Sequence, residues 1–263
     1  MIKIDYTNVM AKVIGEKDGI ILEEFQEYSH IVQEIHEKIQ KEKDTKFYFT
    51  KLPYQNTQEI KNLAKEIREN FDYFVVIGIG GSALGNQMLQ EAINGFNYNN
   101  FEFPKLYILD NVDPEKFGNV LDLIDVRKTM FNVITKSGST VETMANFAII
   151  YTTLKELLPD TYKNHLIFTT DPEKGFLRKF GQQEGIRTLD IPPFVGGRFS
   201  VLTAVGLLSA AVCGIDINNL LEGARKADEI CSKTSLITEN PAYLIGLIHY
   251  IAAEKKGKSI SVM

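Results

Sequence analysis

Short apolar runs alternate with stretches of helical periodicity between residues 72 and 190, and this alternation constrains the fold more than any other feature of the chain. The apolar runs are 73–77, 106–109, 131–134, 166–168 and, more weakly, 186–189. The helical stretches between them are 84–95, 114–125, 139–158 and 173–184. Strands that are apolar on both faces and alternate with helices are typical of a parallel sheet covered on both sides. The sequence therefore predicts an α/β domain with a doubly wound, five-stranded parallel sheet.

Helical patterns lie on both sides of this region. Before it, apolar residues spaced alternately by four and three predict a helix over 21–39, and a second helix is expected from Asn56 to Phe71. After it, three helices are expected at 200–213, 217–232 and 241–256. The last five residues, 259–263, have the pattern of a beginning strand. We therefore expect three parts: a helical extension (1–71), the sheet domain (72–198) and a helical segment that ends in a strand (199–263).

Charge and composition exclude several classes of protein. The chain has 29 Lys and Arg residues against 34 Asp and Glu, so its net charge of −5 gives no broad basic field for nucleic acid. It has no run of about 18 uninterrupted apolar residues, so no membrane span is expected. The first ten residues, MIKIDYTNVM, lack the layout of a secretion signal.

The cysteines and histidines predict neither a disulfide nor a metal site. Cys213 and Cys231 fall on predicted helices with no second thiol within four residues, which excludes a cysteine-based zinc site and a disulfide scaffold. No histidine has a cysteine at ligand spacing. These features are typical of a reduced, cytoplasmic protein.

A glycine-rich segment, Gly78 to Gly85, follows the first predicted strand. Ligands of open α/β sheets bind at the carboxyl ends of the strands, where glycines let the backbone approach an anion and Ser82 adds a hydroxyl donor. The alternative is a tight turn that binds nothing. The segment also matches part of the dinucleotide fingerprint, but the acid that this fingerprint needs about 20 positions further on is misplaced, because Asp110 comes 27 positions after Ala83. A phosphate-binding P-loop is excluded because Asn86 stands where lysine is required.

Four hydroxyl groups and a lysine lie within six residues, Thr135 to Thr140, directly after the third predicted strand. Hydroxyls, free backbone N–H groups and an ammonium all donate to a phosphate, and the dipole of the following helix favours an anion. The alternative is a helix cap, with Ser139 or Thr140 as the capping residue and Glu142 as the acid of a capping box. Capping does not explain Lys136, since a cation at a helix N-terminus is unfavourable unless an anion lies there too. The two loops together predict a phosphomonoester site.

Two glycines and an arginine, Gly196-Gly197-Arg198, follow the last predicted strand. Arg198 carries a permanent charge on a planar fork, and Ser200 can cap the next helix. Two interpretations stay open at this point. The glycines either hold a functional arginine close to a ligand, or Arg198 is ion-paired at the edge of the domain.

Three passages resemble the bacterial type of the glucose-6-phosphate isomerase family: VVIGIGGSALG at 75–85, ITKSGSTVET at 134–143 and GGRFSVLTAVGLLSAA at 196–211. The resemblance covers all 263 residues, including the N-terminal helices. It implies that the sheet domain is the first of two sugar isomerase (SIS) domains and that the helices after residue 200 lead into the second, with 259–263 as its first strand. Because family members are longer, we expect this chain to be the N-terminal part of such an enzyme.

The resemblance also implies roles for individual residues. The sugar phosphate would be bound by Ser82 and by a loop that contains Thr135, Lys136, Ser137 and Thr140. Gly80 and Gly81 would lie beneath the substrate, and Arg198 would face the enediolate as the catalytic residue of this part of the chain. The family's catalytic glutamate, histidine and lysine have no counterpart here, so we expect the 263 residues alone to be inactive.

The reaction implied by the resemblance is the reversible isomerisation of glucose 6-phosphate and fructose 6-phosphate through a cis-enediol(ate). It needs no cofactor and no metal, and the full-length enzyme would be a cytoplasmic homodimer. The main alternative is a non-catalytic SIS module that binds a sugar phosphate for sensing or regulation. A nicotinamide-dependent oxidoreductase is disfavoured by the misplaced Asp110 and by the hydroxyl-rich loop after the third strand.

Overall fold

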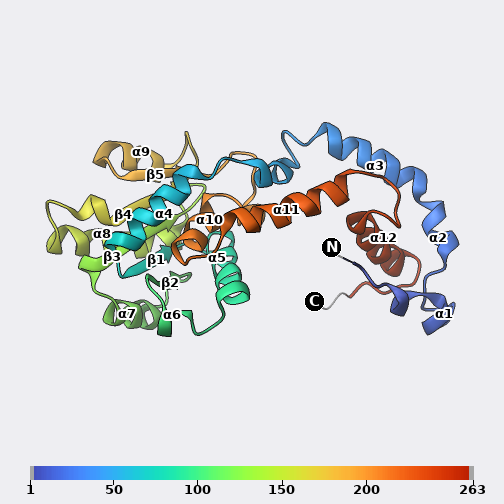
Figure 1. The fold of residues 1–263 in the computed structure, drawn as a ribbon, viewed down its shortest axis with the longest axis horizontal. Helices are drawn as coiled ribbons and strands as arrows, with labels where there is room; N and C mark the ends of the chain where they lie inside the picture. The colour runs from blue at the N-terminus through green and yellow to red at the C-terminus, as the bar shows by residue number, and fades with distance from the viewer. Residues whose placement is uncertain (1–2, 261–263) are drawn as a thin grey trace. The chain divides into compact units, whose positions relative to one another are not determined.

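The computed structural model describes residues 3–260 (Figure 1). Contacts divide the chain into two compact units: Lys51–Leu221, and Met1–Thr50 together with Glu222–Met263. By these contacts, helices α4 (Gln58–Asn70) and α10 (Ala204–Val212) are part of the unit that contains the sheet. The domain boundaries expected after residues 71 and 198 stay a prediction.

Five parallel strands form the sheet: β1 (Tyr73–Ile77), β2 (Lys105–Leu109), β3 (Thr129–Ile134), β4 (Leu166–Thr170) and β5 (Arg187–Asp190). The predicted five-stranded parallel α/β sheet is confirmed, and its strand order is β2-β1-β3-β4-β5. Strands β3 and β4 are buried along their whole length, as expected for strands that are apolar on both faces. Strand β1 lies between β2 and β3, so that Ile77 pairs with Leu109 on one side and Val133 on the other.

Helices cover both faces of the sheet. On one face α4, α5 (Leu84–Leu89) and α10 share a core with Phe74 and Val76 of β1. On the other face α7 (Pro114–Leu123), α8 (Val141–Leu157) and α9 (Phe176–Glu184) share a core with Val75 and Ile77. Successive residues of a strand point to opposite faces, so the apolar run of β1 supplies both cores. The helix after β1 thus lies on one face and the helices after β2, β3 and β4 lie on the other, which makes the junction of β1 and β3 the topological switch point of the sheet.

Short helical turns connect the larger elements: η2 (Tyr48–Tyr54), η3 (Gly80–Ser82), the π turn η4 (Gln90–Asn94), α6 (Tyr98–Phe101), η5 (Val126–Lys128), η6 (Tyr162–His165) and η7 (Gly197–Phe199). The helix predicted over 84–95 is therefore not regular throughout. It changes to a π turn after Leu89 and ends at Gly95, which has a φ of +78° that favours glycine.

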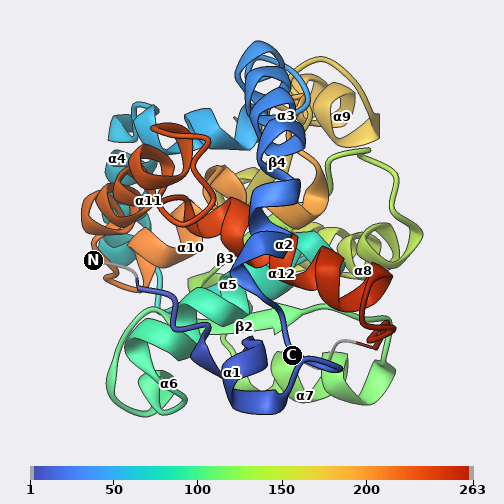
Figure 2. The ribbon, with the colours of Figure 1, turned by 90° about the vertical axis from the view of Figure 1, so that its right-hand side faces the viewer.

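The smaller unit joins the two ends of the described chain. Its helical elements are η1 (Thr7–Val9), α1 (Ala11–Ile14), α2 (Leu22–Glu27), α3 (Ser29–Lys41), most of α11 (Ile217–Ser232) and α12 (Pro241–Glu254). The helix predicted over 21–39 is interrupted at Tyr28, which ends α2. Asn240 caps α12, with its side-chain oxygen accepting from the amide of Ala242 at 3.1 Å. The N-terminal helices lie beside α12 (Figure 2). Phe25 and Val32 share a core with Leu247 of α12.

Three lysines at the end of α12 bind acidic residues of the N-terminal segment. Lys255 pairs with Glu27, Lys256 with Glu24 at 3.1 Å, and Lys258 with Asp18 at 2.6 Å. Residues 259 and 260 are not in a strand, and the remainder of the strand expected at 259–263 lies outside the described residues. Within residues 3–260, every helix is too short or too polar to cross a bilayer.

Candidate functional site

The glycine-rich loop after β1 turns sharply at the carboxyl edge of the sheet. Gly80 has a φ of +56° and begins the turn η3, a conformation that residues with a Cβ rarely adopt. A Cβ at Gly78 would lie 3.1 Å from the carbonyl oxygen of Ile134, the last residue of β3. The glycines therefore let this loop pass beside the beginning of the loop after β3. Ser82 is half-buried at the end of the turn.

The hydroxyl groups of the loop after β3 form one cluster. The Thr135 Oγ1 lies 2.7 Å from the Thr140 Oγ1, and the Ser137 Oγ lies 3.3 Å from the first and 3.4 Å from the second. Thr135 is buried, whereas Ser137 and Ser139 are exposed. The hydroxyl donors of this loop are therefore held together at the buried Thr135 and are open to solvent at Ser137 and Ser139.

Helix α8 begins at Val141 without a side-chain cap. Thr140 occupies the capping position, but its side chain accepts no hydrogen bond from the first turn and contacts the Thr135 hydroxyl instead. The capping interpretation is therefore wrong for Thr140. A helix of 17 residues presents unbonded N–H groups and partial positive charge at such an end, which favours an anion.

Lys136 crosses from this loop to the segment that follows β5. Its ammonium donates to the carbonyl oxygens of Pro193 at 2.5 Å and Val195 at 2.9 Å. Within residues 3–260 no acidic side chain is ion-paired with it. These two hydrogen bonds give a structural reason for a lysine at this position, which the sequence pattern did not suggest.

The loop before α10 packs directly on the loop after β1. A Cβ at Gly81 would lie 2.2 Å from the carbonyl oxygen of Gly197, so only glycine fits at this crossing. The Ser200 hydroxyl donates to the Gly197 carbonyl at 2.7 Å and reaches the Gly81 carbonyl at 3.4 Å. Arg198 lies in the turn η7 and is exposed, and no residue of the described chain forms an ion pair or hydrogen bond with its guanidinium. Among residues 3–260, Arg198 is therefore not ion-paired at the edge of the domain, and this interpretation is wrong for the described part of the chain.

Two buried polar residues support the first loop from beneath. Asn86 is 2% exposed, and its amide donates to the Ser82 carbonyl at 2.8 Å. The Ser209 hydroxyl, from α10, donates in turn to the side-chain oxygen of Asn86. This connection was missed from the sequence, where Asn86 served only to exclude a P-loop. The partners are 123 residues apart, so no local pattern could reveal them.

The loop after β4 closes the far side of the hydroxyl cluster. Gly138 and Gly175 both have positive φ, and a Cβ at Gly175 would lie 2.5 Å from the Ser137 carbonyl. Partial burial acts to raise the pKa of Asp171 in this loop. Hydrogen bonds from the amides of Glu173 and Lys174 outweigh that effect and hold the pKa below its usual range.

The three sequence motifs therefore meet at one place. The two donor-rich loops follow β1 and β3, which are neighbours at the switch point where open α/β sheets bind ligands. The arginine loop contacts the first through Gly197 and the second through Lys136. All eight residues expected to bind or act on substrate lie in these loops: Gly80, Gly81, Ser82, Thr135, Lys136, Ser137, Thr140 and Arg198. Their roles toward a ligand stay a prediction.

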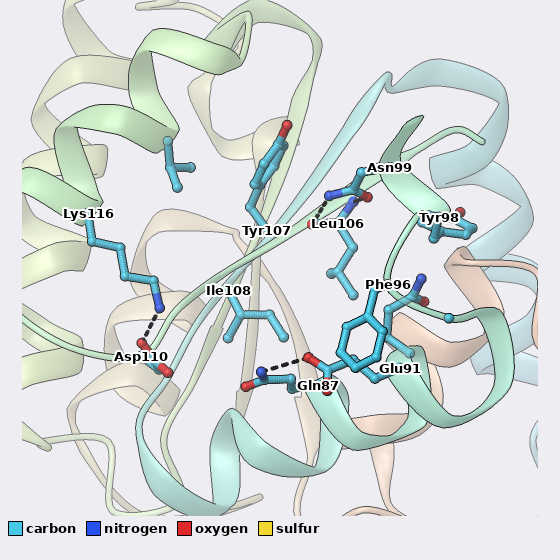
Figure 3. A pocket seen from close by; sticks show the side chains of 13 residues that line it. Gln87, Glu91, Phe96, Tyr98, Asn99, Leu106, Tyr107, Ile108, Asp110 and Lys116 are labelled. Carbon is cyan, nitrogen blue, oxygen red and sulfur yellow. Dashed lines mark hydrogen bonds and ion pairs between the residues drawn. The ribbon is translucent and has the colours of Figure 1, made fainter. Parts of the chain in front are cut away.

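A separate pocket lies along β2, at the outer edge of the sheet (Figure 3). Two pairs of its polar side chains bind one another: Lys116 pairs with Asp110 at 2.6 Å, and Gln87 donates to Glu91 at 2.8 Å. None of the three motifs lines this pocket. Asp110, the acid that a dinucleotide site would need, is bound to Lys116 in the first turn of α7.

The described residues contain no cluster of three or more histidine, cysteine or acidic side chains that could hold a metal ion. Both cysteines are free thiols. Burial raises the pKa of the Cys213 thiol to about 12, which keeps it protonated and unreactive.

Comparison with known proteins agrees with this arrangement. The family model described as Phosphoglucose isomerase matches residues 57–260, which include all three loops. The chain belongs to the phosphoglucose isomerase family. A relative named glucose-6-phosphate isomerase from Carboxydothermus hydrogenoformans is 44% identical over the whole chain and is covered to 58% of its own length. Another of that name, from Thermus thermophilus, is 48% identical over 59% of this chain and 36% of its own.

Solved structures extend the family likeness to the fold. A hypothetical protein from Thermus thermophilus matches with a TM-score of 0.75 and 35% identity, over 87% of this chain and 55% of its own. A glucose-6-phosphate isomerase from Chlamydia trachomatis matches with a TM-score of 0.65 and 23% identity, over 76% of this chain and 37% of its own. The second match supports the fold alone. The chain spans 58% or less of the length of these relatives.

Proposed function

We propose that this chain supplies the phosphate-binding half of the active site of a glucose-6-phosphate isomerase. The whole enzyme would interconvert glucose 6-phosphate and fructose 6-phosphate through a cis-enediol(ate). One observation supports the proposal most strongly. Two donor-rich loops, each followed by a helix without a side-chain cap, meet at the β1/β3 switch point together with an arginine that has no partner among the described residues. Membership of the family supports the choice of this reaction over other sugar-phosphate chemistry.

The phosphate would lie between the loop after β1 and the N-terminus of α8. Its hydroxyl donors would be Ser82 and the cluster of Thr135, Ser137 and Thr140. Lys136 would contribute its backbone N–H group, and the bare backbone of Gly80 and Gly81 would let the substrate approach closely. No acidic residue lies in 78–85 or 135–140, so nothing in these loops opposes an anion.

Arg198 would act at the other end of the sugar. Negative charge develops on the enediolate oxygen during the reaction, and an exposed guanidinium without a partner among the described residues can stabilise it there. The phosphate keeps its charge throughout, so its binding energy serves to position C1 and C2 for reaction. This division of roles predicts that Arg198 affects turnover more than binding.

A base that carries the proton between C2 and C1 is not part of the site as described. Glu142 belongs to the first turn of α8, the helix that would hold the phosphate, and this is the wrong end of the sugar. Asp110 is occupied by Lys116. We therefore propose that the base comes from outside the described residues and that these 263 residues alone do not turn over substrate, since a general base contributes roughly 100- to 10,000-fold.

The test is a coupled assay of glucose 6-phosphate formation from fructose 6-phosphate. Arg198→Ala in the whole enzyme is expected to lower kcat roughly 100- to 1000-fold, with a much smaller change in KM. Arg187→Ala is the matched control, because Arg187 is an exposed arginine of β5 that pairs with Glu66. An unchanged kcat with a raised KM would reassign Arg198 to ground-state binding. A whole enzyme that does not isomerise this pair would refute the proposed function.

The setting of the enzyme is part of the same proposal. Two free thiols and a metabolite substrate are consistent with a reduced, cytoplasmic location. A homodimer is proposed from the resemblance, and no nucleic-acid partner is proposed because the net charge is −5.

A further inference from the structure

We propose that the ammonium of Lys136 is a positioning group that fixes the Arg198 loop, and that it is not a ligand of the phosphate. This inference rests on the proposed function, because it assigns a role within the same site. It differs from the role suggested by the sequence, in which the side chain of Lys136 binds the phosphate with the neighbouring hydroxyls.

The ammonium of Lys136 uses most of its donors within the protein. An ammonium has three N–H groups, and two of those of Lys136 are directed at the carbonyl oxygens of Pro193 and Val195. Both distances, 2.5 and 2.9 Å, are at or below the usual length of a charge-assisted hydrogen bond. Turning the side chain toward the phosphate would break both bonds and leave two carbonyls without this donor.

The second argument is the place of the two carbonyls in the chain. Val195 is 1% exposed and its amide donates to the Pro192 carbonyl at 3.0 Å, so residues 192–195 form a tight turn. Gly196 follows at once and accepts from the amide of Phe199 at 2.9 Å. Arg198 lies within this second turn. Lys136 therefore holds the chain three residues before Arg198.

The third argument is that the Arg198 loop has a second anchor on its other side. Gly197 lies against Gly81, and Ser200 bonds to the carbonyls of both. The loop thus rests on the loop after β1 at Gly197 and on the loop after β3 through Lys136. With both anchors in place, the phosphate loops determine where the guanidinium stands relative to a bound sugar phosphate.

The experiment compares two ligands on the 263-residue chain. Inorganic phosphate probes the phosphate loops alone, and a six-carbon aldonic acid 6-phosphate adds a carboxylate in place of the enediolate that Arg198 would face. The ratio of the two affinities measures the contribution of Arg198. It separates the effect of the arginine from that of the phosphate loops without requiring turnover. The variants are Lys136→Met, Arg198→Ala and Thr140→Val, the last as a matched change in the hydroxyl cluster.

The expected result separates the two roles of Lys136. In Lys136→Met the preference for the aldonic acid phosphate falls roughly tenfold toward that of Arg198→Ala, because the two hydrogen bonds to Pro193 and Val195 no longer hold the loop. Hydrogen exchange at the amides of Phe199 and Ser200 rises by a similar factor. In Thr140→Val both affinities fall together, while the preference and the exchange rates stay at their wild-type values.

The opposite pattern would overturn the proposal. If Lys136→Met weakens both ligands equally and leaves exchange at residues 199 and 200 unchanged, Lys136 is a phosphate ligand. A wild-type chain without any preference between the two ligands would contradict the role of Arg198 in the proposed function, and the exchange rates would still decide the role of Lys136.

A measurement on the wild-type chain covers the case in which Lys136→Met does not fold. The ¹⁵N resonance of the Lys136 Nζ is followed during a phosphate titration. A positioning lysine keeps its carbonyl partners, so its resonance moves less than that of the Thr140 amide. A larger shift at the Nζ than at the amide would overturn the proposal.

Discussion

Helices α7 and α8 both follow a strand at the same edge of the sheet and pack on the same face, but their N-termini differ. Asp113 caps α7 by accepting from the amides of Glu115 at 2.9 Å and Lys116 at 3.2 Å. Thr140 stands at the same position of α8 and caps nothing. The first amides of α7 are bound by a side chain of the protein. Those of α8 have no side-chain cap and lie beside a glycine-rich loop. The difference separates a structural connection from a binding loop.

The loop sequences show the same contrast in charge. The segment after β2 contains Asp110 and Asp113, and both carboxylates are bound by protein donors. The segment after β3 contains hydroxyls and no acid. An anion would be repelled at α7 and attracted at α8, because the helix dipole is the same in both and the side chains are not. Hydroxyl-rich loops that do not cap their helix are therefore the better candidates for phosphate sites.

The largest effect is expected when α8 is given the N-terminal cap of α7. Thr140→Asp places a carboxylate at the capping position and is expected to weaken phosphate binding about 100-fold, from roughly 2–3 kcal/mol of like-charge repulsion. The same change should stabilise the fold by about 1 kcal/mol through the new cap. Calorimetric titration and chemical unfolding measure the two effects. Phosphate affinity that survives the substitution would place the anion elsewhere.

The support of the first loop predicts a loss of stability. Asn86→Ala removes the side chain that joins the Ser82 carbonyl to the Ser209 hydroxyl, so the carbonyl loses this donor and the hydroxyl keeps only its bond to the Gly206 carbonyl. The free energy of unfolding should fall by about 1–3 kcal/mol. Asn62→Ala is the control, since Asn62 is exposed on α4. Equal effects of the two substitutions in urea unfolding would mean that the buried link contributes nothing.

The smallest effect is expected at α7. Asp113→Ala removes its cap and should lower the free energy of unfolding by about 1 kcal/mol without changing phosphate affinity. Asp122→Ala, an exposed residue of the same helix, is expected to change neither quantity. Weaker phosphate binding in Asp113→Ala would erase the distinction between the two loops.

The sequence predicts the strands, helices and loops whose formation depends on residues that are close together in the chain. Apolar runs such as 73–77 predict the strands, and the helix expected at 241–256 is observed as α12. The hydroxyl-rich and glycine-rich loops are also visible, because each lies within a few residues. Periodicity and local composition are sufficient for these features.

Contacts between distant segments could not be predicted. Lys136 reaches carbonyls 57 and 59 residues away, and a carbonyl partner leaves no trace in the identity of the residue that carries it. The approach of Gly81 to Gly197 depends on the strand order, which the sequence does not reveal. The pairing of the tail after α12 with the N-terminal segment depends in the same way on how distant helices pack.

A titration of the chain with inorganic phosphate, followed through its backbone amide resonances, tests whether the two loops bind an anion. The account predicts saturable shifts at Gly80, Gly81, Ser82, Lys136, Ser137 and Thr140, and no shift at Glu115 and Lys116, whose amides are bound by Asp113. Unchanged resonances in both loops, or shifts at the N-terminus of α7 equal to those at α8, would contradict it.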